Sequence, residues 1–448
     1  MSLFNSITIR MNMKEALATG CLIFSGLLLQ AQTVTLDKAV KSALTNNKQM
    51  QNEKLNVTSA AYRVAESKSV LLPHADAMTQ YQYYLDLPAQ YAPASNFGGP
   101  EGEYSKMTMN VPQTMNATVQ ITQVVHNREA TLRIQSAKLA LEASKLKAGM
   151  TKEDLVYNVT ATYYTIQVLQ ENLARLSDNI TNLKQTVSIN AVLKNSELIS
   201  ENTHNRLLIN LENLNNEYEY QQLSLTNNLT LLKYLMNVNV TDTIAVVPFD
   251  YAEIEYHEQP SNLPHRPDLQ FQQMQIYMAE LEMKSIQSRY MPVVNATFSS
   301  GFTGYNDSFT PYERINNDWV GNSYFGFSMK VPLFAGFQKK IQQGEQKIAI
   351  ESSRNTLAYM QLNAEKELQD AKEQYFTSKN QLNHTKTSLD LAKKLFDSAQ
   401  YDYVNGIITI TDLLNAQNDL TDARTNYSST LLQVKLAELS IMKASGLL

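Results

Sequence analysis

The stretch YDYVNGIITITDLLNAQNDLTDAR, residues 401–424, interrupts a proline-free arm that runs from Phe337 to Leu448. Gly406 can adopt the positive φ at which many helices end. Thr409 or Thr411 can then cap the helix that follows. The stretch therefore predicts a turn between two helices.

Large residues recur every seven positions on both sides of this turn: Leu368, Tyr375, Leu382, Leu389, Phe396 and Tyr403 before it, and Leu413, Leu420, Tyr427, Val434 and Ile441 after it. Small residues follow most of them three positions later, among them Ala371, Ala392, Ala399, Ala416, Ala437 and Ala444. A sustained period of seven indicates helices that supercoil around neighbouring helices. The arm predicts an antiparallel helical hairpin, whose first helix would be roughly 105 Å long at about 1.5 Å per residue.

The first half of the chain carries the same pattern. Its large residues with a period of seven are Val159, Ile166, Leu173, Ile180 and Val187. A break at Asn195-Ser196 precedes a second helix with Leu207, Leu211, Leu214 and Tyr218. A constant shift of 209 residues carries the first series onto Leu368, Tyr375, Leu382, Leu389 and Phe396. The same shift carries Leu211, Tyr218, Leu225 and Leu232 onto Leu420, Tyr427, Val434 and Ile441. We conclude that the chain is a tandem duplication.

Two segments alternate between apolar and polar residues, which is typical of β-strands with one face in an apolar environment. The more apolar face carries Ala77, Thr79, Tyr81, Tyr83, Leu85, Leu87, Met115, Ala117, Val119 and Ile121 in the first segment, and Val294, Ala296, Phe298, Phe302, Ser323, Phe325, Phe327 and Met329 in the second. The two segments predict one β-hairpin over 75–125 and another over 293–333. The exposed loops of these hairpins are expected at 88–106 and 304–318. A helix from Leu36 to Leu72 should precede the first hairpin, and a helix from Arg266 to Tyr290 the second.

The domain organisation follows from these elements. Residues 1–31 read as a signal peptide, because Arg10 and Lys14 precede an apolar run from Leu17 to Leu29. Translation could begin at Met1, Met11 or Met13. Cys21 faintly resembles a lipidation site, but the apolar run continues past it, which favours a plain signal. The first repeat covers 32–237, a connector 238–265, and the second repeat 266–448.

Composition excludes several classes of function. The net charge of −5 over 448 residues offers no basic patch for nucleic acid. The single cysteine and six scattered histidines form no metal-binding pattern. No glycine-rich phosphate loop is present, and Ser144-x-x-Lys147 lies inside a helical arm without companion motifs. We therefore expect no catalytic residues, no metal and no cofactor.

Four strands per chain cannot close a transmembrane barrel, since the smallest known barrels need about eight. Open strand edges are not tolerated in lipid. Three copies would supply a twelve-stranded barrel. The fold expected from the residues is mostly α, with long antiparallel coiled-coil hairpins and a trimeric transmembrane β-barrel. The alternative is a non-conducting periplasmic coiled coil or adhesin, which would need no barrel closure.

The chain resembles the TolC-type outer-membrane efflux proteins (outer membrane factors) over nearly its whole mature length. The motifs that carry the resemblance are Arg266-Pro267-Asp268-Leu269, Val331-Pro332-Leu333-Phe334-Ala335-Gly336, Tyr403-x-x-Gly406, Asp412-Leu413-Leu414-x-Ala416-Gln417 and Ala423-Arg424. The resemblance implies a homotrimer in the outer membrane, with a twelve-stranded β-barrel and a long antiparallel coiled-coil α-barrel that extends into the periplasm. It also implies a periplasmic adaptor (membrane fusion) protein and an inner-membrane pump as partners, in contact with the helical tips.

The resemblance also implies residue roles. A periplasmic gate is expected at Tyr403, Ile408, Asp412 and Asn415. Asp412 keeps the carboxylate of the family's acidic ring, whereas Asn415 and Ile408 stand where the family often has an acid and a base. The first hairpin departs further, with Glu197, Thr203 and Arg206 at the places equivalent to Gly406, Asp412 and Asn415. Adaptor contacts are expected at the tips: Asn195, Ser196, Glu197, Gly406 and Ile407. From the residues alone, Asp412 could equally be a solvated helix-start carboxylate, and Tyr403 a core residue of the heptad seam.

Overall fold

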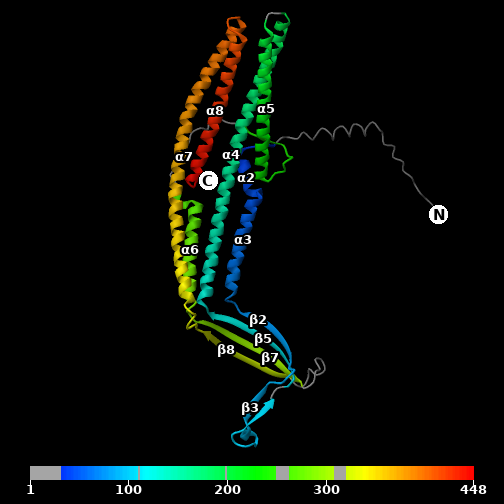
Figure 1. Ribbon diagram of the computed structural model, residues 1–448, viewed down its shortest axis with the longest axis vertical. Coiled ribbons are helices and arrows are strands. Elements are labelled where there is room, and N and C mark those ends of the chain that lie inside the picture. The colour runs from blue at the N-terminus through cyan, green and yellow to red at the C-terminus, as the bar shows by residue number, and fades with distance from the viewer. Residues whose placement is uncertain (1–31, 109–110, 197–198, 249–261, 307–318) are drawn as a thin grey trace, which may run out of the picture. The chain divides into compact units, whose positions relative to one another are not determined.

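The computed structural model describes residues 32–108, 111–196, 199–248, 262–306 and 319–448 (Figure 1). The expected signal peptide, Cys21, Glu197, residues 249–261 of the connector and residues 307–318 of the loop 304–318 lie outside the described residues. In chain order the elements are β1 (Gln32–Val34), α2 (Leu36–Asn46), α3 (Lys48–Ser69), β2 (His74–Tyr83), β3 (Ala89–Pro93), η1 (Ala94–Phe97), β4 (Tyr104–Thr108), β5 (Gln113–His126), α4 (Arg128–Asn195), α5 (Glu201–Met236), β6 (Ile244–Val246), η2 (Leu263–His265), α6 (Pro267–Ser288), β7 (Val293–Asn306), β8 (Trp319–Lys330), α7 (Gln338–Val404) and α8 (Ile410–Ala444).

These elements confirm the predicted fold class: a mostly helical chain with a four-stranded sheet. The chain divides into two compact units. A helical unit contains residues 1–52, 149–266 and 363–448, and a sheet-bearing unit contains 53–148 and 267–362. Each unit combines parts of both sequence repeats, so the repeats and the compact units do not coincide.

The sheet-bearing unit is built around one antiparallel sheet with the strand order β2-β5-β7-β8. β2 and β8 form its two edges, while β5 and β7 join the two predicted hairpins along a long ladder. The register pairs Tyr81 with Met115, Ala117 with Phe302, and Phe298 with Phe325. Side chains opposite each other in a ladder point to the same face. The predicted apolar positions of all four strands therefore share one face.

The other face of the sheet carries polar residues. Gln80 pairs with Asn116, which pairs with Thr303, and the Thr303 hydroxyl donates to Asn116 Oδ1 at 2.8 Å. Residues on this face include Asp76, Gln82, Thr118, Gln120, Thr122, Asn295, Thr297, Ser299, Tyr324, Ser328 and Lys330. The sheet thus separates an apolar face from a polar face, as the alternation predicted. Leu85 and Leu87, which the alternation assigned to the first strand, lie beyond the end of β2.

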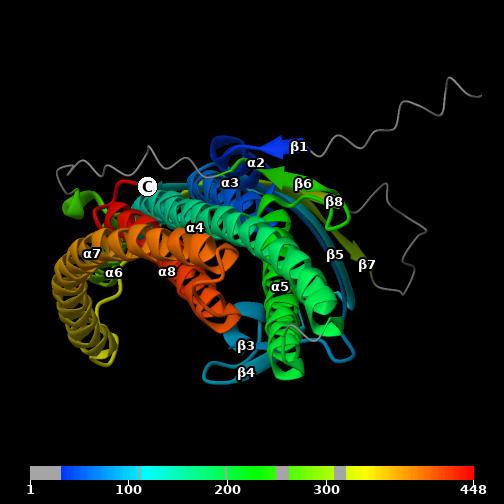
Figure 2. The same cartoon turned by 90° about the horizontal axis from the view of Figure 1, so that it is seen from above.

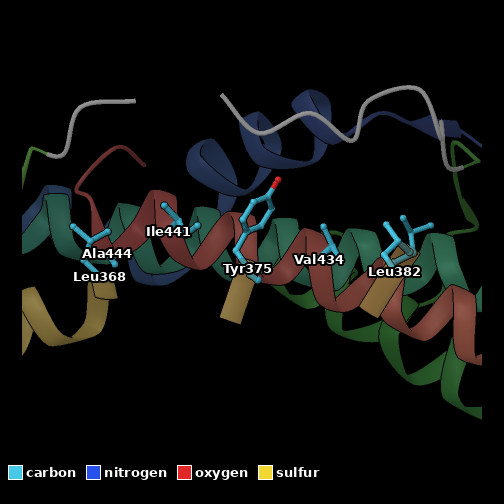
Figure 3. Packing of buried hydrophobic residues seen from close by; sticks show 8 residues of the cluster. Leu368, Tyr375, Leu382, Val434, Ile441 and Ala444 are labelled. Carbon is cyan, nitrogen blue, oxygen red and sulfur yellow. The ribbon is translucent and has the colours of Figure 1, made fainter. Parts of the chain in front are cut away.

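The helical unit is held together by the predicted seams with a period of seven. Figure 3 shows Leu368, Tyr375 and Leu382 of α7 against Val434, Ile441 and Ala444 of α8. Leu431, fully buried, completes this cluster. α8 also lies against α4 (Figure 2), where Asn179 Nδ2 donates to Thr421 Oγ1 at 3.2 Å. Each buried leucine contributes about 1.5–3 kcal/mol.

Arg266 of the predicted RPDL motif ties three segments of the helical unit together. Its Nη1 donates to the carbonyl oxygen of Ala444 at 3.4 Å and to Glu367 Oε2 at 3.0 Å. A cation near the last carbonyls of α8 is favoured by the helix dipole. Arg266 therefore anchors the C-terminal end of α8 to α7.

The expected single helix from Leu36 to Leu72 is wrong, because Asn47 divides it into α2 and α3. Asn47 has ψ 129, which is outside the helical range. Its Oδ1 accepts from the backbone nitrogens of Gln49 and Met50 at 2.9 and 3.2 Å, and its Nδ2 donates to Leu235 O at 2.9 Å. Asparagine competes with the helical hydrogen bonds in this way at helix starts.

Two further segments differ from expectation. The segment 88–106, expected to be a loop, contains the β3–β4 hairpin, in which Gly98 and Gly102 adopt positive φ. The connector contains β6, which pairs in parallel with β1. Three-residue strands that lie more than two hundred residues apart leave no periodic signal in the sequence. Over the described residues, no helix is long and apolar enough to cross a membrane.

Candidate site at the helical hairpin tips

The tip of the α7–α8 hairpin is a closed turn. Ile407 N donates to Asp402 O at 2.9 Å, and Gly406 N donates to Tyr403 O at 3.0 Å. This pair of bonds is the Schellman arrangement, which needs a left-handed residue after the helix. Gly406 supplies it with φ +71, and a Cβ at this position would meet no atom within 4 Å. Gly406 is therefore required by its backbone conformation and not by crowding.

Thr409 and Asp412 then start α8 with a capping box. Asp412 N donates to Thr409 Oγ1 at 3.3 Å, and Thr409 N donates to Asp412 Oδ2 at 3.0 Å. The Thr409 hydroxyl also donates to Asp412 Oδ2 at 2.7 Å. The hydroxyl bond and then the backbone bond hold the pKa of Asp412 below its ordinary value of 3.8. The carboxylate is thus ionised near neutral pH and has a structural role as a helix cap.

The tip of the first hairpin repeats this arrangement with different chemistry. Ser200 caps α5 by accepting from Thr203 N at 3.2 Å, and its hydroxyl lies 2.9 Å from Thr203 Oγ1. A shift of 209 residues carries Ser200 and Thr203 onto Thr409 and Asp412. The duplication therefore extends to the caps, but only the cap of α8 uses a carboxylate, that of Asp412. Asn195 and Ser196 are exposed at the end of α4.

The two tips pack against each other through one apolar cluster. Its buried residues are Leu183, Leu207, Ala399, Ile410, Leu413, Leu414 and Ala416, and Tyr403 and Ile408 pack against it half-buried. Ile408 therefore contributes an apolar side chain to the contact between the tips. Tyr403 contacts the seam, as one of the two interpretations predicted.

Asn190 completes the contact between the tips and was not singled out from the sequence. Its side chain is 1 % exposed. Nδ2 donates to Thr186 O at 2.9 Å and to the Tyr403 hydroxyl at 3.5 Å, and Oδ1 has no hydrogen-bond partner within the described chain. The signal was present, because the series Leu169, Leu176, Leu183 continues to Asn190. A polar residue at such a seam position fixes the register of helices at a cost in stability.

Asp412 and Asn415 are both exposed, one helical turn apart on α8, while Leu413, Leu414 and Ala416 between and beside them are buried. They therefore lie on the side of α8 that faces away from the tip cluster. Gly406 and Ile407 are exposed at the end of the same hairpin. The structure thus brings Tyr403 and Ile408 into the cluster and leaves Asp412, Asn415, Gly406 and Ile407 accessible.

A polar cavity of about 480 Å³ lies between α4, α5 and α8 of the helical unit. Arg175 and Arg424 both line it, and Arg175 Nε donates to Glu171 Oε1 at 3.1 Å. Burial lowers the pKa of Arg424, and the neighbouring Arg175 lowers it further, while Asp397 and Asp178 act in the opposite direction. The Ala423-Arg424 motif of the sequence therefore places a half-buried guanidinium at the junction of the two hairpins. Guanidinium stays charged in such a setting.

Within the described ranges, no group of three His, Cys, Asp or Glu side chains lies close enough together to hold a metal ion.

The chain is similar in sequence to one protein family and in fold to several solved structures. Residues 261–447 match the family model described as outer membrane efflux protein. No curated protein matches the chain. Solved structures with the same fold include the CmeC outer membrane channel of Campylobacter jejuni, with 17% identity, a TM-score of 0.74, and coverage of 92% of this chain and 85% of that one.

Two other solved structures are similar over comparable lengths. VceC of Vibrio cholerae shares 13% identity with a TM-score of 0.73, and covers 92% of this chain and 96% of its own. MtrE of Neisseria gonorrhoeae shares 16% identity with a TM-score of 0.74, and covers 92% of this chain and 89% of its own. Residues 261–447 are thus similar to the outer membrane efflux protein family, and the described chain shares its fold with solved outer membrane channels.

Proposed function

We propose that three copies of this chain form a passive channel-tunnel, the exit duct of a tripartite efflux or type I secretion system. The observation that carries the proposal is the sheet with two open edges, β2 and β8. Unpaired backbone groups cannot be satisfied in lipid. Pairing β2 of one copy with β8 of the next satisfies them, and three copies reach twelve strands, above the minimum of about eight.

The two faces of the sheet support the same assembly. A transmembrane barrel needs an apolar outer face and a polar lumen. The face with Phe298, Phe302, Phe325 and Phe327 suits lipid, and the face with Asn116 and Thr303 suits water. A soluble hairpin would leave these four aromatic residues in water, where an apolar patch favours association.

Exposed apolar residues with a period of seven on three helices also support contacts with neighbouring copies. On α7, the exposed residues Ile341, Ile348, Leu362 and Phe376 follow multiples of seven. Leu55 and Tyr62 of α3 are exposed and lie seven residues apart. Ile209 and Leu223 of α5 are also exposed and lie fourteen residues apart. Apolar seams of this kind need a partner helix. A ring of three chains would pair the seams of α7 with those of α3 and α5.

The hairpin tips would form the periplasmic gate. Asp412 and Asn415, turned away from the tip cluster, would face the lumen near the threefold axis. The contacts of Tyr403 and Ile408 would hold the tips closed, and the exposed tip residues Gly406, Ile407, Asn195 and Ser196 would meet a periplasmic adaptor protein, with an inner-membrane pump behind it. The gonococcal channel MtrE has been solved in a state described as open, which supports a tip with two arrangements. Asp412 can cap α8 and face the lumen at once, because one Oδ atom is engaged by Thr409.

The experiment is conductance in planar bilayers with two neighbouring substitutions in β7. Wild-type protein should give stepwise currents. Thr297→Arg, on the polar face, should insert and change the conductance, whereas Phe298→Arg should prevent insertion, since arginine facing mid-membrane lipid costs about 2–4 kcal/mol. The proposal would be contradicted if the wild-type protein gave no current. It would also be contradicted if Phe298→Arg inserted into the bilayer while Thr297→Arg failed to insert.

A further inference from the structure

Exposed apolar side chains gather where the sheet meets the helices. The register places the start of β2, the end of β5, the start of β7 and the end of β8 at one end of the sheet. In Figure 1 these strand ends lead into α3, α4, α6 and α7. The exposed residues next to them are Leu72, Val125, Met291, Leu333, Phe334 and Phe337, which we name the collar.

The segment after β8 is the most exposed part of the collar. Leu333, Phe334 and Phe337 are 91%, 76% and 67% exposed. The rings of Phe334 and Phe337 pack edge to face with centroids 5.6 Å apart. They cover each other and little else of the described chain. Apolar surface of this size in a folded protein marks a place of interaction.

The backbone is strained in the conformation that exposes this pair. Phe337 has φ +62, directly after Gly336 with φ +57. A bulky residue in the left-handed region is costly and persists where something outside the local turn compensates for it. Within the turn, Phe337 O accepts hydrogen bonds from Lys340 N at 2.9 Å and from Ile341 N at 3.1 Å, which start α7, while the Phe337 ring remains 67% exposed. We take the strain as a second, independent indication that the ring has an external partner.

Basic groups lie directly beside the collar. Lys339 is 9% exposed, and its ammonium donates to Arg289 O at 2.5 Å and lies 4.2 Å from the centre of the Tyr290 ring. No carboxylate of the described chain lies within ion-pair distance of it. The two nearby carboxylates form ion pairs with Arg289 instead. Arg289 Nε lies 3.4 Å from Glu129 Oε1, and Arg289 Nη2 lies 3.5 Å from Glu282 Oε1. Lys340 is exposed next to Lys339. The site therefore carries uncompensated positive charge.

We propose that the collar and these basic groups bind phospholipids with anionic head groups in the periplasmic leaflet of the outer membrane. The inference rests on the proposed function, because it takes the sheet to span that membrane. The collar continues the apolar face of the sheet at the end joined to the helices. Aromatic rings favour the boundary between acyl chains and head groups, and lysines beside it attract anionic lipid. Insertion of the Phe334–Phe337 pair supplies the stabilisation that the strained turn requires.

The test uses the single tryptophan of the chain, Trp319. In a Trp319→Phe background, Phe337→Trp and Phe334→Trp are reconstituted into vesicles with lipids brominated near either end of the acyl chains. Both tryptophans should lose most of their emission to bromine near the head groups and less to bromine near the methyl ends. Tyr220→Trp, equally exposed on α5 of the helical unit, is the control and should keep its emission.

The same vesicles are checked for conductance, so that the two claims separate. Conducting vesicles in which the tryptophans at 334 and 337 are not quenched would overturn the lipid inference and indicate that a neighbouring copy covers the collar. Non-conducting vesicles would count against the proposed function, whatever the quenching.

The charge requirement is tested separately. The thermal midpoint of detergent-extracted protein should rise with added phosphatidylglycerol more than with phosphatidylcholine. Lys340→Gln should remove most of this difference, and because Lys340 is exposed, its loss leaves the packing intact. Lys386→Gln changes the charge equally on the exposed surface of α7 in the helical unit and should leave the difference unchanged. An equal response to both lipids in the wild type would overturn the anionic part of the proposal.

Discussion

Asn190 of α4 donates from Nδ2 to the hydroxyl of Tyr403 of α7 at 3.5 Å, inside the apolar contact between the two hairpin tips. The bond is long, and Asn190 Oδ1 has no partner in the described chain. A buried amide that is half satisfied weakens packing. The tips are thus joined by an interaction that is specific but weak, which suits the opening of the proposed gate.

Replacing the amide with an apolar side chain should strengthen this contact. Asn190→Leu restores the seam of Leu169, Leu176 and Leu183 and should stabilise the protein by about 1–2 kcal/mol, since it removes an unsatisfied buried group. Asn383→Leu, on the exposed side of α7, is the control and should change stability by less than about 0.5 kcal/mol. Thermal unfolding followed by circular dichroism measures both. A loss of stability in Asn190→Leu would show that the amide is better satisfied than the structure indicates.

The cap of α8 should weaken in acid. The folded-state pKa of Asp412 is below its ordinary value of 3.8, so its contribution is complete above that value and is lost as pH falls through the lower folded-state pKa. As pH falls below 3.8, the backbone amides in the first turn of α8 should therefore lose protection from hydrogen exchange. The amides in the first turn of α5 should lose less, because the Ser200–Thr203 cap does not titrate. Asp412→Asn should abolish the difference in pH response between the two tips. Parallel behaviour of both wild-type tips would contradict the assignment.

Gly406 should resist substitution for a conformational reason. Gly406→Ala forces an L-residue to φ +71 and should destabilise the protein by about 1–2 kcal/mol. Gly344→Ala is the matched control, because Gly344 lies inside α7 with free space around it and should stabilise by about 0.5–1 kcal/mol. Chemical denaturation of the two variants should shift in opposite directions. The same sign for both would show that the turn at Gly406 is not left-handed in solution.

The exposed carboxylate of Asp412 should attract cations in the assembled channel. Three copies near one axis would bind multivalent cations, so Asp412→Ala should weaken their block of single-channel current and reduce cation preference. Asn415→Asp, one turn along the same exposed side, should strengthen the block. Both effects should fade with salt, because the screening length is only about 10 Å at 0.1 M. Unchanged block in Asp412→Ala at low salt would leave Asp412 with the capping role alone.

More of the fold than of the candidate site could be predicted from the sequence. Residues repeated with period seven or two report burial along a single element, which is why the arms, the four strands and the apolar face around Phe298 could be predicted. Asn47 and the β1–β6 pair depend on contacts with residues far along the chain, such as Leu235 and Val246, and no local pattern carries them.

At the tips, the turn at Gly406 and the cap at Thr409 were local and therefore predictable. The pairing of Asn190 with Tyr403 depends on which helices become neighbours, so the sequence showed only an anomaly in a heptad series. The strain at Phe337 had no sequence signal beyond the preceding Gly336.

The central claim is that neighbouring copies close the sheet by pairing β2 with β8. The most direct measurement is disulfide cross-linking with one cysteine at Thr79 in β2 and another at Ser323, Phe325 or Phe327 in β8, all on the same face of the sheet. Two strands separate β2 from β8 within a chain, about 14 Å at the usual strand spacing, so a bond between them joins two copies. We predict that one of the three pairs yields covalent dimers and trimers on a denaturing gel and no larger species. Only monomers for all three pairs, or a ladder that continues beyond the trimer, would contradict the account.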